Sequence, residues 1–155
     1  MPVPSDMQRL TYLSLVNPQR MALTSLTLKD GTHIPKGSRI AWAGYHHAND
    51  PAVVSNPHDF DPMRSYRKRH ADGGKNMSRF TAGQTNSSSL SFGYGGQACP
   101  GRYFAVSETK MVLARLLLDF DIKFPEGKTR PKIMYADENV FMDPSAKLMM
   151  RKRRA

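Results

Sequence analysis

The chain has 155 residues, at most the length of one domain, and its 39% hydrophobic and 23% charged residues indicate a folded rather than a disordered protein. A single cysteine excludes an internal disulfide framework and a cysteine-based zinc site. Nothing resembles a signal peptide, and no apolar run approaches the ~20 residues that a membrane-spanning helix requires.

The formal net charge of +10 is concentrated partly in two basic runs, residues 67–70 (RKRH) and 151–154 (RKRR). Such runs occur in proteins that bind nucleic acid or acidic membranes. They are more often a solvated surface and a frayed tail, and this is the interpretation that we favour here.

The first half of the chain predicts one short helix and a β-hairpin. We expect the helix over residues 5–15, ended by Asn17-Pro18. Residues 23–28 alternate in polarity and predict a strand, and Asp30-Gly31 predicts a hairpin turn after it. Beyond this we expect a turn at residues 35–37, a strand at 39–44, and a turn or short helix from residue 49.

The second half predicts a long loop, a long helix and short closing strands. Residues 55–90 hold few apolar residues and many breakers, so we expect irregular structure throughout. From Gly101 to Phe120 the apolar residues recur at helical spacing, which predicts an amphipathic helix. After it we expect extended segments at residues 121–124, 140–141 and 147–150.

The only cysteine, Cys99, lies in the segment FGYGGQACPG, residues 92–101. This segment fits the pattern F-x-x-G-x-x-x-C-x-G at every fixed position. Glycines let the backbone approach the sulfur, and Pro100 suits the first position of a helix whose positive end would stabilise a thiolate. The alternative is an ordinary buried thiol beside a glycine-rich turn.

The pattern resembles the haem-ligand loop of the cytochromes P450, the haem-thiolate monooxygenases. The resemblance covers nearly the whole chain, which is similar to the C-terminal portion of such a protein, most like fungal members that act in secondary metabolism. It implies an α+β fold in which residues 1–155 form a single partial domain. The weaker matches, in the right order, are residues 30–38, 49–51, 60–64 (FDPMR), 102–105, 131 and 143–147.

The resemblance implies haem b as the cofactor, with the Cys99 thiolate as the axial ligand of the iron. A thiolate pushes electron density toward the iron and favours cleavage of the O–O bond. Residues 13–18 and 138–141 would line the pocket for an apolar small-molecule substrate. The other implied cofactor-binding residues are Phe92, Gly95, Gln97, Gly101 and Arg20.

Two positions depart from the family pattern. Asp6 and Arg9 stand where the family has Glu-x-x-Arg, and the shorter carboxylate would have to reach both Arg9 and Arg64; alternatively, Asp6 is an N-cap. Gln97 stands where the family has an arginine or histidine against a haem propionate, and glutamine carries no charge. Arg20 would then supply a propionate contact, or it is an exposed arginine at the start of a strand.

The resemblance also implies partners and a location. Electrons would come from an NADPH-cytochrome reductase-type donor that docks as an acidic protein on a basic face, and no nucleic acid partner is expected. The oxygen-activating helix and the membrane anchor of the family are not found before Asp6. We therefore expect the chain alone to be cytoplasmic and not to hydroxylate, although full-length relatives usually lie at the endoplasmic-reticulum membrane.

The sequence is compatible with three functions. The first is the haem-binding portion of a monooxygenase, and the second is a truncated, non-catalytic P450-like pseudoenzyme. The third is a basic module that binds an anionic partner through the cluster at Arg67 and the C-terminal tail. His46 and His47 fall in a predicted strand-to-turn region, and we do not expect them to bind iron.

Overall fold

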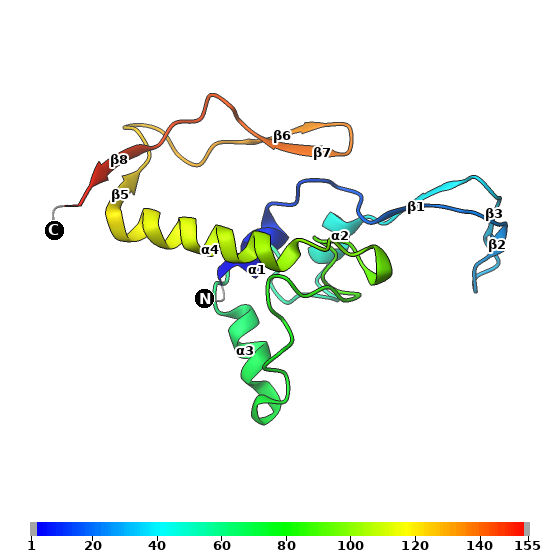
Figure 1. The fold of residues 1–155 in the computed structure, drawn as a ribbon. Helices are drawn as coiled ribbons and strands as arrows, with labels where there is room; N and C mark the ends of the chain where they lie inside the picture. Colours follow the sequence, from blue (N-terminus) through cyan, green and yellow to red (C-terminus); the bar gives the residue numbers. More distant parts are fainter. Residues whose placement is uncertain (1–2, 154–155) are drawn as a thin grey trace.

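The structure, a computed structural model, describes residues 3–153 as helices and paired strands distributed along an open chain (Figure 1). This mixture confirms the predicted α+β class. The helices are α1 Val3–Leu10, α2 Gly44–Ala48, α3 Arg64–His70 and α4 Arg102–Asp119, with 3-10 turns η1 Ala71–Gly74 and η2 Gly95–Gln97.

The described strands form antiparallel pairs and no larger sheet. The pairs are β1 Gln19–Met21 with β4 Arg39–Ala41, β2 Leu26–Thr27 with β3 His33–Ile34, β5 Phe120–Lys123 with β8 Met149–Lys152, and β6 Ile133–Ala136 with β7 Asn139–Met142. Figure 1 shows the first two pairs as one arm that extends away from the helices, while β5 and β8 meet at the end of α4.

The arm confirms the predicted hairpin but corrects its strands. Gly31 has φ +90°, and Thr32 N donates to Asp30 Oδ1 at 3.0 Å, as an Asp-Gly turn requires. Of residues 23–28 only Leu26–Thr27 form a strand, and β1 was not predicted at all. Its partner lies far away in sequence, with Arg20 opposite Ile40, so no local pattern indicates it.

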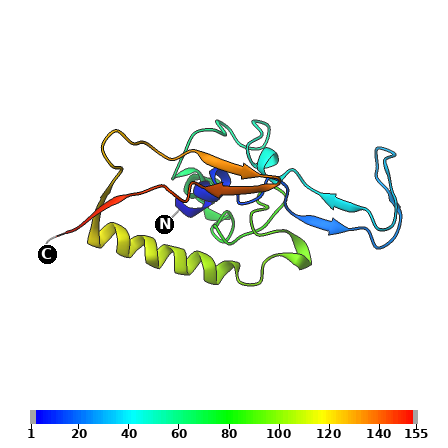
Figure 2. The same cartoon turned by 90° about the horizontal axis from the view of Figure 1, so that it is seen from above.

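Helix α1 ends at Leu10, not at residue 15, because the following segment pairs with the β6–β7 hairpin. Leu15 N donates to Glu138 O at 2.7 Å, and Val140 N donates to Leu13 O at 3.0 Å. Figure 2 shows this hairpin lying over the region of α1, with its turn toward the base of the arm, where Glu138 pairs with Arg39. Residues 13–15 therefore take part in an extended ladder that a helix could not form.

The expectation of an irregular loop over residues 55–90 is wrong at its centre, where α3 and η1 form. Arg64 is anchored by Asp6, the Tyr66 and His70 rings stack at 3.9 Å one turn apart, and Arg67 pairs with Asp61. The polar composition hid this helix because it has no buried residue. In Figure 1 it projects away from α1 and α4.

The chain exposes far more surface than a compact protein of its mass. Its accessible area is 11441 Å² at 17.4 kDa, whereas a compact monomer of this mass exposes about 7,900 Å². Helix α4 forms as predicted, but Val106 is its only buried side chain. Among the described residues the buried apolar core is small and consists of Tyr12, Ala22, Ala48, Val54, Ala82, Leu90 and Val106.

Candidate functional site

The cysteine segment forms a closed loop between the buried Leu90 and helix α4. Cys99 N donates to Phe92 O at 2.9 Å, which joins the two ends of the loop, and Ala98 N donates to Gly95 O at 3.0 Å inside it. The Cys99 side chain is exposed, and Phe92 is half-buried. The alternative of an ordinary buried thiol is therefore wrong.

Two glycines of this loop are required by its geometry. Gly93 has φ +76° and Gly95 has φ +65°, values that side chains with a Cβ rarely adopt. A Cβ on Gly93 would also lie 3.2 Å from Gln97 O. Gly96 and Gly101 have neither a positive φ nor a neighbour that a Cβ would meet. Among the described residues, nothing steric therefore requires a glycine at position 101, although the pattern fixes one there.

Helix α4 begins two residues later than the sequence predicts. Pro100 precedes the helix and Gly101 is its N-cap, so Pro100 is not the first helical residue. Arg102 holds this junction: its Nη1 donates to Cys99 O at 2.9 Å, and its guanidinium lies 4.6 Å from the Tyr103 ring centroid. The sequence analysis missed Arg102, although its i+3 spacing from Cys99 is the signal of a side chain that reaches back to the loop.

Arg20 lies against the cysteine loop. Its Nη2 donates to Tyr94 O at 3.2 Å and its Nη1 to Gln19 O at 2.7 Å, and its side chain is half-buried. The alternative of a simply exposed strand arginine is therefore wrong. Gln97 is exposed in η2, in the same loop. Arg20 therefore contacts, at Tyr94, the same loop that carries Gln97 and Cys99.

The segment that leads into the loop is held by side chains from two other elements. Asn17 Nδ2 donates to Leu90 O at 2.9 Å, and the His47 Nε2 atom lies 2.8 Å from Ser87 O. His46 and His47 lie in helix α2, not in a strand-to-turn region. The described residues contain no group of three His, Cys, Asp or Glu side chains that could hold a metal ion, and of the two histidines it is His47 that contacts the segment before the loop.

The predicted ion-pair cluster forms, and Asp6 is its centre. Arg9 Nε lies 2.9 Å and Arg64 Nε 3.0 Å from Asp6 Oδ1, and Asp61 N donates to Asp6 Oδ2 at 2.6 Å. Asp6 is 3% exposed. Burial alone would raise the pKa of this carboxyl, but the hydrogen bonds from Arg9 and Asp61 and the two guanidinium charges lower it below 3.8.

The N-cap alternative for Asp6 is wrong, because α1 already includes Val3. Arg9 extends the cluster instead: its Nη1 donates to Asn49 Oδ1 at 2.9 Å and also to Pro57 O, and its Nη2 donates to Asp59 O at 3.0 Å. Asn49, which the sequence predicts only as the start of a turn, caps the C-terminus of α2. One carboxylate and one buried arginine thus join α1, α2, α3 and the segment of residues 57–61.

The sequence model of the family described as cytochrome P450 matches residues 5–150. The chain belongs to the cytochrome P450 family. A P450 monooxygenase of Stachybotrys chlorohalonatus, ATR4, is 59% identical over 92% of this chain and 27% of its own length. The P450 monooxygenase sdnB of Sordaria araneosa is 45% identical over 97% of the chain and 28% of its own length. The chain therefore spans under a third of these curated relatives.

Solved P450 structures share the fold. The haem domain of cytochrome P450DA matches 98% of this chain and 31% of its own length with a TM-score of 0.73 and 23% identity. The retinoic acid-bound cyanobacterial CYP120A1 matches 96% of the chain and 31% of its own length with a TM-score of 0.70 and 20% identity. In the part of the chain that the structure describes, no helix is long and apolar enough to cross a membrane.

Haem with a cysteine thiolate ligand is the cofactor of the P450 family. The residues present fit this group. The only sulfur nucleophile is exposed on a loop whose backbone is held in position by Phe92 O and shaped by Gly93 and Gly95. The Arg20 guanidinium beside Tyr94 is a donor suited to a carboxylate such as a propionate.

Proposed function

We propose that residues 1–155 are the cysteine-side part of a single haem-thiolate monooxygenase domain that oxidises an apolar small molecule in fungal secondary metabolism. The observation that carries this proposal is the exposed Cys99 at the end of a loop closed by its own N–H and bordered by Arg20. When bound, haem would supply the oxygen chemistry. The chain's residues would hold, orient and shield it.

Each loop residue has a separate task in this proposal. Cys99 would bind the iron through its thiolate, and Phe92, half-buried at the start of the loop, would limit access of water to the sulfur once haem is bound. Gly95 gives the loop its turn, and Gly101 caps α4. Arg20 and Gln97 would contact the propionates, Arg20 with a charge and Gln97 with a neutral amide.

The substrate pocket in this proposal lies where residues 13–18 meet residues 138–141. Hydrogen bonds join the two segments, at Leu15 with Glu138 and at Leu13 with Val140. A cavity of about 410 Å³ adjoins them, and its lining includes Phe141, which is 52% exposed. An apolar substrate suits such a lining because its burial removes apolar surface from water.

The electron donor in this proposal is an NADPH-cytochrome reductase-type protein with an acidic docking face. Helix α3 supports this part, because three successive cations, Arg67, Lys68 and Arg69, lie on an element with no buried residue. Full-length members of the family usually lie at the endoplasmic-reticulum membrane, and we propose that location for the intact enzyme. The proposal includes no nucleic acid partner.

The alternative is a P450-like pseudoenzyme, and Gln97 is the observation that favours it. A neutral amide is a weaker propionate partner than arginine. The test starts with haem reconstitution. Reduced chain with haem and carbon monoxide should show the strongly red-shifted Soret band of thiolate ligation, Cys99→Ser should abolish it, and Ser107→Ala, exposed on α4, should retain it.

Turnover separates the remaining functions. We expect the chain with haem, reductase and NADPH to form no substrate-dependent product above free haem, because Cys99 is open to solvent in the described structure and oxygen activation requires exclusion of water. The same assay on an intact enzyme that contains this sequence should form product. A thiolate spectrum without product from the intact enzyme would establish the pseudoenzyme, and a red-shifted band in Cys99→Ser would refute the ligand assignment.

A further inference from the structure

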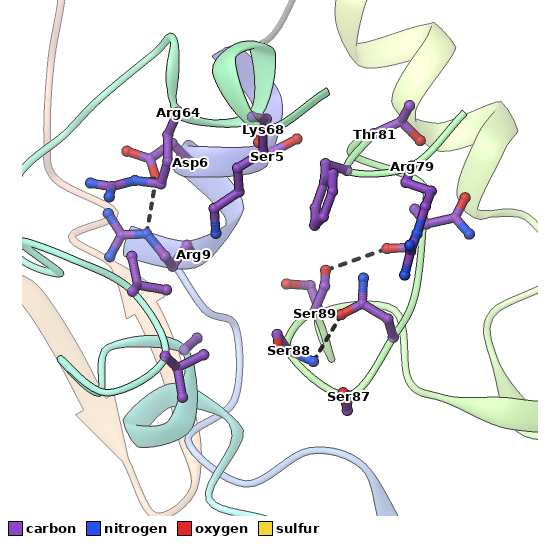
Figure 3. A pocket seen from close by; sticks show the side chains of 18 of the residues that line it. Ser5, Asp6, Arg9, Arg64, Lys68, Arg79, Thr81, Ser87, Ser88 and Ser89 are labelled. Carbon is purple, nitrogen blue, oxygen red and sulfur yellow. Dashed lines mark hydrogen bonds and ion pairs between the residues drawn. The ribbon is translucent and has the colours of Figure 1, made fainter. Parts of the chain in front are cut away.

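A second, polar cavity of about 270 Å³ lies between α1, α3 and the segment of residues 79–91. Figure 3 shows Lys68 and Arg9 on one side of it and Arg79 with the turn of Ser87–Ser89 on the other. Four basic side chains and one carboxylate line the cavity, so its wall carries a formal excess of three positive charges (four minus one). The charged lining residues are Arg9, Arg64, Lys68, Arg79 and Asp6.

The single carboxylate, Asp6, already has hydrogen-bond partners on both of its oxygens. Asp6 Oδ1 accepts from Arg9 and Arg64, and its Oδ2 accepts from the Asp61 N–H. Among residues 3–153, neither Lys68 nor Arg79 has a carboxylate within 4.0 Å, and the one hydrogen bond that the Arg79 side chain makes is a long one of 3.5 Å to Asn76 Oδ1. Two cations of this wall therefore have no anionic partner.

Phe80 holds these two cations at the cavity. Lys68 Nζ and the Arg79 guanidinium carbon each lie 5.8 Å from its ring centroid. Phe80 has φ +58°, a left-handed backbone that costs a non-glycine residue on the order of 1–3 kcal/mol and that is concentrated at ligand-binding and active sites. The strained residue thus positions an aromatic face between two charges that would otherwise separate.

The turn of Ser87–Ser89, on the same side of the cavity as Arg79, supplies neutral donors. Asn86 and Ser89 exchange backbone hydrogen bonds of 3.2 and 3.0 Å, and Ser88 N donates to Asn86 Oδ1 at 2.8 Å, which fixes the turn. The hydroxyls of Ser87 and Ser88 make no hydrogen bond within the described chain, and both residues line the cavity. Lys68 on one side of the cavity, and Arg79 with the free hydroxyls on the other, are donors that a phosphate group accepts from.

We propose that this cavity binds a phosphate-type oxyanion, free or as a monoester, between Lys68, Arg79 and the hydroxyls of Ser87 and Ser88. A phosphate group is favoured over a carboxylate because it carries close to two negative charges and has at least three acceptor oxygens that can reach both walls. The bound anion would join α3 to the turn that leads into Phe92 and the cysteine loop. This proposal does not depend on haem binding.

The test is a calorimetric titration of the chain with inorganic phosphate and with glycerol 3-phosphate, at ionic strength held constant with sodium chloride. We expect saturable binding of at least one of the two. Lys68→Gln and Arg79→Gln should each weaken it at least tenfold, and both are exposed changes that should leave the fold intact. Lys75→Gln is the matched control, because Lys75 is an exposed cation of the same region that does not line the cavity.

The arms also separate the two sources of the ligand. Tighter binding of glycerol 3-phosphate assigns the cavity to a phosphomonoester, and tighter binding of inorganic phosphate assigns it to the free ion. Bound ligand should raise the melting temperature in proportion to the logarithm of its concentration. Absence of saturation with both ligands, or an equal loss in Lys75→Gln, would refute the proposal and leave only general attraction to a basic surface.

Discussion

Arg64 of α3 donates from Nε to Asp6 Oδ1 of α1 at 3.0 Å, across 58 residues of sequence. The same Asp6 oxygen accepts from Arg9 Nε, and its Oδ2 accepts from the Asp61 N–H, so one aspartate contacts both arginines. Side chains of Asp6 and Arg64 are 3% and 12% exposed, so this bond is protected from water. The contact fixes the position of α3, and with it the cations of residues 67–69 and the polar cavity that Lys68 lines.

Asp6→Asn should destabilise the chain by about 3–5 kcal/mol, because it leaves Arg9 buried without its counter-charge. Asp6→Glu keeps the charge and should cost less. Arg39→Gln is the control: it breaks an ion pair with Glu138 whose side chains are 61% and 36% exposed, and should cost at most about 1 kcal/mol. Urea unfolding measures the free energy of unfolding of all three variants. Equal losses for Asp6→Asn and Arg39→Gln would contradict the cluster's role.

The stability of the chain should depend on pH through Asp6. The pKa of Asp6 is lower in the folded chain than its ordinary value of 3.8, so the folded state binds fewer protons than the unfolded state in this range. The stabilisation is complete above pH 3.8 and is lost as the pH falls through the lower native pKa. Urea midpoints measured from pH 7 to pH 2 should show this fall, and Asp6→Asn should flatten it.

Gly93→Ala should disturb the cysteine loop, whereas Gly96→Ala should not. Gly93 has φ +76°, and a Cβ there would lie 3.2 Å from Gln97 O, so the change costs about 1–3 kcal/mol. Gly96 has open space around its Cβ position and no positive φ. Thermal unfolding and haem affinity are the measurements. An equal loss of thermal stability or haem affinity in Gly96→Ala and Gly93→Ala would contradict this explanation, because Gly96 has neither the positive φ nor the close neighbour of Gly93.

Gln97→Arg should slow the loss of haem, because a guanidinium adds a charge-assisted hydrogen bond of about 1.5–3 kcal/mol to a propionate. Arg20→Gln should act in the opposite direction. Transfer of haem to an apo-acceptor protein measures both rates. Lys128→Gln, an exposed change away from the loop, is the control. Equal or faster loss from Gln97→Arg would rule out a propionate contact at this position.

The outer face of α4 should make the isolated chain prone to self-association. Phe104, Met111 and Leu118 recur every seven residues on one face and are 73%, 64% and 66% exposed. Leu113 and Leu116, in contrast, are half-buried. Met111→Lys with Leu118→Lys should shift the chain toward monomer in analytical ultracentrifugation, with helicity unchanged. The same change at exposed Glu108 and Arg115 should have no such effect.

The sequence alone determined the features that rest on short-range chemistry. The F-x-x-G-x-x-x-C-x-G spacing identified the cysteine loop, Asp30-Gly31 gave the hairpin turn because only a few residues accept its backbone, and the apolar repeat after Gly101 gave α4. These features are local, since their determinants lie within about ten residues of one another. The family followed from the same local pattern.

Only the tertiary structure decided the features that depend on partners far along the chain. Strand β1 exists because Arg20 lies opposite Ile40, and the segment after α1 is extended because Leu15 pairs with Glu138. Arg20 reaches the cysteine loop through Tyr94, 74 residues away. Neither propensity nor spacing encodes such contacts, because the free energy that fixes them is gained only when distant backbone and side-chain groups meet.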